Sequence, residues 1–113
     1  MISKELTEKA LEAVEIAKNT GKIKKGANEV TKVVERGIAK LVLVAENTNP
    51  PEIIMHLEPL CKEKNVPFVK VSTKEELGTA AGLGVATTAV VIVNEGEAKE
   101  AIRSVERMLQ AQK

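Results

Sequence analysis

The spacing of apolar residues along the chain switches between two patterns. In three segments they recur every three or four positions, which predicts helices with one side against a core. Elsewhere, short continuous runs of Val, Ile and Leu predict strands that are covered on both faces. The expected helices are 6–17, ending near Asn19–Gly21, then 26–37 between two glycines, and 98–109; the expected buried strands are 41–45 and 88–93.

Two further strands follow from composition and charge. FVKV (68–71) has the β-branched content of a strand. KIKK (22–25) is short and rich in lysine, which is typical of a strand at the edge of a sheet, where lysines prevent unwanted pairing. The sheet is therefore expected to contain about four strands.

Capping residues predict where two more helices begin. Asn49 can cap a third helix that has Pro50 in its first turn and Glu52 completing the pattern. Ser72 with Glu75 gives the same signal for a short fourth helix. Helices that alternate with strands predict an α/β fold, a three-layer α/β/α sandwich around a small mixed sheet.

Composition limits the setting of the protein. Of 113 residues, 43% are hydrophobic, enough for one core, so residues 1–113 are expected to form a single domain. Cys61 is the only cysteine and cannot form an intramolecular disulfide. No apolar run approaches the ~18–20 residues of a membrane span, and the N-terminal segment lacks the core of a signal peptide. We therefore expect a soluble, cytoplasmic protein.

Positive charge is concentrated between residues 18 and 40. Seven Lys or Arg residues stand there against two Glu, whereas the whole chain has a net charge of +1. Such asymmetry is typical of a surface that binds a polyanion, and equally of a solvated lysine-rich face. Phe68 is the only aromatic residue. A nucleic acid therefore cannot be bound by stacking its bases on a platform of aromatic rings.

Four polar residues of this basic segment share one side of the second predicted helix. At ~100° per residue, they fall within a sector of about 100°, opposite the valines that face the core. They are Asn28, Glu29, Lys32 and Arg36. The N-terminus of a helix also favours anions. An ordinary amphipathic helix, with a Glu29–Lys32 pair, would show the same pattern.

Glu29 separates two roles for this surface. A phosphate site needs cations only, so a carboxylate there would weaken it. A surface that recognises bases needs both signs, because a guanine presents N1–H and N2–H₂ donors beside its O6 acceptor. Glu29 and Lys32 together would match that edge. Since the edge is hidden in a regular duplex, the target would be an irregular RNA with an open guanine edge.

The same residues carry a resemblance to a known family. GANEVTK (26–32), preceded by IKK and followed by ERG and AKLV, is similar to the archaeal L-seven-Ae family of kink-turn-binding RNA proteins. PPEIIMHLEPLCKEKNVPFVKV and ELGTAAGLGVATTAVVIV extend the resemblance over nearly the whole chain. The family binds the kink-turn, an internal loop in which tandem sheared G·A pairs adjoin a three-nucleotide bulge.

The resemblance implies roles for particular residues. Sheared pairs leave the guanine N1–H and O6 open, so Asn28, Glu29 and Lys32 would recognise the guanines. The residues implied to lie along the RNA backbone are Lys24, Lys25 and Arg36. Gly26, the first residue of the GANEVTK motif, is also expected among the RNA-binding residues.

The loop before the last strand would present an apolar surface, exposed in the free protein, to a flipped-out bulge nucleotide. Ile53 would also line the pocket that this nucleotide enters. Many relatives carry Glu at position 84, where this chain has Gly84, so that position offers no polar side chain here. The loop residues implied by the resemblance are Leu83, Gly84, Val85 and Ala86.

The resemblance also implies partners. The chain would be a non-catalytic module that stabilises kink-turns in ribosomal RNA, in box C/D and H/ACA guide RNA and in RNase P RNA. In guide particles it would prepare the RNA for a Nop-domain scaffold protein and the methyltransferase fibrillarin, or for the pseudouridine synthase. No enzyme activity, cofactor, metal ion, membrane or small-molecule substrate is expected.

Two other interpretations remain open. Gly78-x₃-Gly82-x-Gly84 superficially matches a dinucleotide-binding loop, which would make the chain a small α/β nucleotide-binding protein or enzyme. Such a loop must run from a strand into a helix, and the predicted order here is the reverse. A ribosome-associated paralogue with another RNA target is the closer alternative. His56 and Cys61 are expected on a helix surface and in the core, not as metal ligands.

Overall fold

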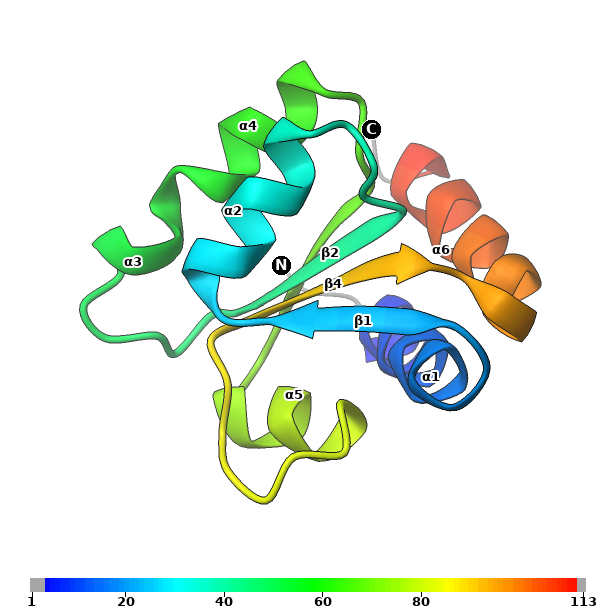
Figure 1. Cartoon of the computed structure of the whole chain (residues 1–113), viewed down its shortest axis with the longest axis horizontal. Helices are drawn as coiled ribbons and strands as arrows, with labels where there is room; N and C mark the ends of the chain where they lie inside the picture. The colour runs from blue at the N-terminus through cyan, green and yellow to red at the C-terminus, as the bar shows by residue number, and fades with distance from the viewer. Residues whose placement is uncertain (1–3, 112–113) are drawn as a thin grey trace.

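The computed structural model describes residues 4–111, a small sheet with helices on both sides (Figure 1). All the predicted helices and strands are present. In chain order the elements are α1 (Lys4–Thr20), β1 (Lys22–Lys25), α2 (Ala27–Glu35), β2 (Leu41–Ala45), α3 (Glu52–Met55), α4 (Leu57–Glu63), β3 (Phe68–Val71), α5 (Lys74–Ala80), β4 (Ala89–Asn94), the 3-10 helix η1 (Gly96–Ala98) and α6 (Lys99–Ala111).

The four strands form one mixed sheet, as predicted, and their order is β1-β4-β2-β3, with β1 at an edge as expected. β4 runs antiparallel to β1 and β2, and β2 runs parallel to β3. Lys25 pairs with Val90, and Ala45 pairs with Val71. The last residues of β1, β2 and β3 and the first residues of β4 therefore lie at one end of the sheet, which we call the Lys25 end.

Two apolar cores cover the two faces of the sheet. Because successive residues of a strand point to opposite faces, Leu43 enters the core under α1, α5 and α6, and Val44 enters the core under α2 and α4. Figure 1 shows these two groups of helices on opposite sides of the strands. The predicted three-layer α/β/α sandwich is confirmed. Within the described chain, no helix is long and apolar enough to cross a membrane.

The start of the third helix differs from the prediction. Pro51, not Asn49, is the N-cap of α3, and it makes no side-chain capping bond. Asn49 lies two residues before the cap, at a cis peptide bond with Pro50, so it does not occupy the position from which a side chain can cap. The helix is also interrupted at His56, which separates the single turn of α3 from α4.

The capping pattern of α5 is shifted by one residue. Thr73, not Ser72, is the N-cap, and its hydroxyl accepts a hydrogen bond from the backbone N–H of Glu76 at 3.1 Å. The backbone of Thr73 is extended, as an N-cap requires. The predicted pairing with Glu75 is therefore wrong, although a hydroxyl cap is present.

The structure explains why glycine occupies two positions in α5 and the loop after it. A Cβ at Gly78 would overlap the carbonyl oxygen of Val85, so the loop can close on α5 only because this residue has no side chain. Gly82 follows the end of α5 and has a φ of +74°, a backbone conformation that favours glycine after a helix. The segment runs from a helix into a strand, the reverse of a dinucleotide-binding loop.

Candidate nucleic-acid interface

A hollow of about 440 Å³ lies at the Lys25 end of the sheet and joins four segments of the chain. Lys24, Lys25, Glu29 and Leu83, all predicted site residues, contribute to its walls. The complete lining is Lys18 of α1, Ile23, Lys24 and Lys25 of β1, Glu29 of α2, and Ala81 and Leu83 of the loop after α5. Its surface therefore combines cations, one carboxylate and apolar side chains.

Gly26 sets the direction in which α2 leaves β1. Its φ of 89° lies in the region that favours glycine, and its N–H donates to the carbonyl of Ala89 at 2.9 Å. Its own carbonyl accepts from Val30 at 2.9 Å, which closes the first turn of the helix. No side chain caps this end of α2. The N–H groups of the first turn therefore add positive potential beside the hollow.

The two sides of α2 differ as the sequence predicts. Val30, Val33 and Val34 are buried, and Asn28, Glu29 and Lys32 are exposed on the other side. Arg36 is exposed at the C-cap, about 12 Å along the helix from Asn28 at a rise of ~1.5 Å per residue. It would therefore contact a part of a bound molecule that is distant from the hollow.

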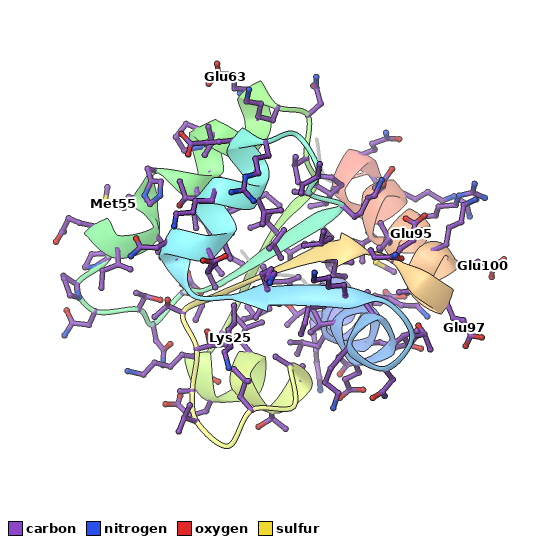
Figure 2. The ribbon with its side chains drawn as sticks, viewed as in Figure 1. Lys25, Met55, Glu63, Glu95, Glu97 and Glu100 are labelled. Carbon is purple, nitrogen blue, oxygen red and sulfur yellow. The ribbon has the colours of Figure 1, made fainter. Side chains whose placement is uncertain are left out.

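The charged groups around the hollow are free to interact with a ligand. Within residues 4–111 the ion pairs are Lys9–Glu12 at 3.2 Å and Lys70–Glu58 at 3.5 Å. The Glu29–Lys32 pair of an ordinary amphipathic helix is therefore absent, and the three lysines of the hollow have no carboxylate within 4.0 Å in this part of the chain. Figure 2 shows Glu95, Glu97 and Glu100 gathered away from Lys25, around the start of α6.

The loop after α5 is anchored at two points and exposed between them. The N–H of Leu83 donates to Gly78 at 2.9 Å, and the N–H of Thr87 donates to Lys74 at 3.1 Å. Val85 is 74% exposed. Gly84 and Ala86 on either side of it are also exposed.

Leu83 corrects the expectation that the whole loop surface is free. It is half-buried and packs against the core under α1, α5 and α6. The hydrogen bond to Gly78 holds the backbone of Leu83 against α5. Leu83 thus offers only part of its side chain, to the hollow, whereas Val85 is largely exposed.

Ile53 lies at the same end of the sheet but does not line the hollow. It is 40% exposed on α3, which follows the segment after β2. Asn47 in that segment accepts a hydrogen bond from the N–H of Lys74 at 2.9 Å. This bond ties the approach to α3 to the start of α5.

Lys18 lines the hollow but was not among the predicted site residues. It belongs to the basic segment, but no motif assigns it a role. Its side chain lies over Gly82, where an added Cβ would be 2.5 Å from the Lys18 Nζ. Gly82, which leaves room for the Lys18 side chain, is 64 residues further along the sequence, so no local motif connects the two residues.

The remaining candidate ligands do not form a metal centre. Cys61 is buried in the core under α2 and α4, and burial raises the pKa of its thiol to about 11. His56 lies at the junction of α3 and α4, not within a helix as predicted, and its Nε2 is 2.7 Å from the hydroxyl oxygen of Thr31. Among residues 4–111 no three His, Cys, Asp or Glu side chains are grouped to hold a metal ion.

We expect the Cys61 thiol to be alkylated slowly by iodoacetamide at about pH 8, and rapidly once the chain is unfolded, because the thiolate is the nucleophile. Mass spectrometry of timed samples measures both rates. Above the ordinary thiol pKa of 9.0 the unfolded chain ionises first, so the free energy of unfolding should fall as the pH rises toward 11. Equal alkylation rates in the folded and unfolded chain would contradict the burial of this thiol.

Comparison with known proteins agrees with this architecture. The family model described as the ribosomal protein L7Ae/L30e/S12e/Gadd45 family matches residues 8–102. A solved structure of the Giardia lamblia 15.5kD RNA binding protein is 32% identical, with a TM-score of 0.91 over 98% of this chain and 92% of that chain. The family match includes all the residues discussed as site residues, from Lys18 to Ala86. The chain belongs to the ribosomal protein L7Ae/L30e/S12e/Gadd45 family.

Proposed function

We propose that this chain binds RNA and recognises kink-turns, with Asn28, Glu29 and Lys32 contacting the guanines of sheared G·A pairs. The observation that carries the proposal is the carboxylate of Glu29, which has no ion pair within the described residues and shares a hollow with three lysines. A carboxylate accepts from N1–H and N2–H₂ of guanine, and a lysine donates to O6. The similar Giardia protein is named as an RNA binding protein, which supports the class of ligand.

The lysines of the hollow hold the RNA backbone. Lys24 and Lys25 end β1 directly before the turn at Gly26, and Lys18 reaches the same hollow from α1. Their positions bring positive charge to the edge of the sheet from two layers. Arg36 adds a cation at the far end of α2, where a neighbouring phosphate of a bent RNA would pass.

A flipped-out bulge nucleotide is held against apolar side chains at the same end of the sheet. Val85 projects from the loop between its two anchors, and Ile53 projects from α3. The exposed apolar area of these side chains has no role in the core. A base packed there would be removed from water.

The action is binding and not catalysis. A kink-turn RNA exchanges between extended and bent forms, and a protein that binds only the bent form shifts the population toward it. The RNAs in which this would occur are ribosomal RNA, box C/D and H/ACA guide RNA and RNase P RNA. In guide particles the bound RNA would be ready for the Nop-domain scaffold protein and fibrillarin, and the protein would act in the cytoplasm.

The proposal is tested with a kink-turn RNA that carries a donor and an acceptor dye on its two arms. Added protein should raise the energy transfer, because the arms come closer in the bent form, with no change for a plain duplex of equal length. Both RNAs must be measured at the same salt concentration, since backbone contacts depend on it. Equal affinity for the two RNAs with no change in energy transfer would contradict kink-turn recognition.

Replacing Lys18, Lys24 or Lys25 with Ala should weaken kink-turn and duplex binding by similar factors. Each replacement should reduce the slope of log affinity against log salt by up to about one, because one phosphate contact is lost. Lys22→Ala is the matched control, since Lys22 begins the same strand but does not line the hollow. A change in discrimination between RNAs with an unaltered slope would show that the backbone assignment is wrong.

A further inference from the structure

Helix α3, which carries Ile53, is weakly held by its own sequence. It has four residues, none of them buried, and its last residue, Met55, is 62% exposed (Figure 2). Its N-cap makes no side-chain bond, and half-buried Ile54 packs against the core under α2 and α4. A single turn of helix is not stable alone. The position of α3 therefore depends on the packing of Ile54 and on what fixes the ends of the helix.

A hydrogen-bonded chain fixes the C-terminal end of α3 to α2. The hydroxyl of Thr31 donates to the carbonyl of Ala27 at 2.7 Å, and the Nε2 of His56 lies 2.7 Å from the same hydroxyl oxygen. A threonine hydroxyl has one proton to donate. Because that proton is given to Ala27, His56 must be the donor in the second bond. His56 thus carries a proton on Nε2, and its ring is held in one orientation.

This series of hydrogen bonds ends at Ala27, beside the residues proposed to contact the guanines. Ala27 is the first residue of α2, and Asn28 and Glu29 follow it directly. At the other end, Ile53 precedes His56 by three residues, about one turn of helix. The path from His56 through Thr31 to Ala27 therefore spans the distance between the surface that contacts guanine and the surface that contacts the bulge nucleotide.

We propose that His56 and Thr31 are positioning residues that set the spacing between the exposed side of α2 and Ile53, a role that rests on the proposed kink-turn function. One rigid RNA must engage both surfaces at once. If α3 is already in place, binding does not have to order it, and the affinity is higher. Neither residue has to touch the RNA for this effect.

The test compares two threonines that make the same pair of bonds. Thr20 donates its hydroxyl to Ile16 at 2.8 Å and accepts from the N–H of Glu97 at 2.9 Å, at the opposite end of β1 from the hollow. Thr31→Val should weaken kink-turn binding by about 3- to 10-fold, the range expected for one net hydrogen bond, with duplex binding unchanged. Both variants should lower the melting temperature by similar amounts, since each loses two hydrogen bonds. Thr20→Val, however, should leave the affinity for both RNAs unchanged.

Two variants of His56 separate positioning from direct contact. His56→Leu removes the donor and should match Thr31→Val, and the double variant should be no weaker than either single one. His56→Gln retains an N–H donor at similar reach and should recover most of the affinity. All titrations are made well below the lowest melting temperature, so that every variant is folded.

Equal losses for Thr31→Val and Thr20→Val would overturn the proposal, since stability alone would then explain the effect. Additive losses in the double variant, or no recovery with His56→Gln, would also overturn it. Wild-type protein that binds kink-turn and duplex equally would overturn the proposed function itself. That result is seen before any variant is made, so the two failures can be distinguished.

Discussion

Replacing Glu29 with Gln should weaken binding to a kink-turn RNA by an amount on the order of 1–3 kcal/mol, the cost of a lost base contact. A carboxylate can accept from N1–H and N2–H₂ of guanine with two oxygens. Gln offers one carbonyl oxygen and must turn its own N–H₂ away from those donors. Binding to a plain duplex should stay level or improve slightly, because one negative charge has left a surface that attracts phosphates.

The sign of this effect distinguishes the two roles of Glu29. If the carboxylate only complements the helix dipole, Glu29→Gln should change the free energy of unfolding by a few tenths of a kcal/mol and strengthen binding to every RNA. Glu35→Gln is the matched control, because Glu35 is an exposed residue that ends the same helix. Titrations of wild type and both variants at matched salt give the answer. Tighter kink-turn binding by Glu29→Gln would exclude the base contact.

Val85→Asp should cost kink-turn affinity on the order of 1–3 kcal/mol, the range associated with a base packed against a side chain. At 74% exposure, the side chain contributes little to the core, so the melting temperature should not change. Ile38→Asp introduces the same charge at another exposed apolar side chain, outside the proposed contacts, and should leave both quantities unaltered. A lower melting temperature with full affinity would place Val85 in the core instead.

Leu83 cannot serve as the same probe. Because its side chain packs against the core under α1, α5 and α6, an Asp there should lower the melting temperature and the affinity together. The sequence alone gave no reason to separate it from Val85. The structure separates them because Leu83 packs against the core and Val85 is 74% exposed, a tertiary difference that a local pattern does not reveal.

The fold was predictable because its elements have strong local signals. β2 is a run of five apolar residues and all five are buried, so a strand covered on both faces followed directly from composition. The glycines that flank α2 have positive φ, as helix boundaries often require. Where two residues could serve as a cap, as with Ser72 and Thr73, the prediction chose Ser72, which is wrong, because the choice depends on where β3 ends.

The site was predictable in part. The structure gathers Lys24, Lys25, Glu29 and Leu83 around one hollow, although their contacts with RNA remain a prediction. Lys18 over Gly82 was not predictable, since the two lie far apart in the chain and meet only through packing. The bond between Thr31 and His56 joins residues 25 apart for the same reason. Both pairs form only because the helices and the sheet pack together in the folded protein.

The central claim is that the protein recognises the open guanine edges of sheared G·A pairs. The most direct measurement compares wild-type binding to a kink-turn with binding to the same RNA after its G·A pairs are changed to G·C, at one salt concentration. Watson–Crick pairing hides the guanine edge and leaves the length and phosphate charge the same. The account predicts that affinity falls to that of a plain duplex and that Glu29→Gln then has no further effect. Unchanged affinity for the G·C version would contradict it.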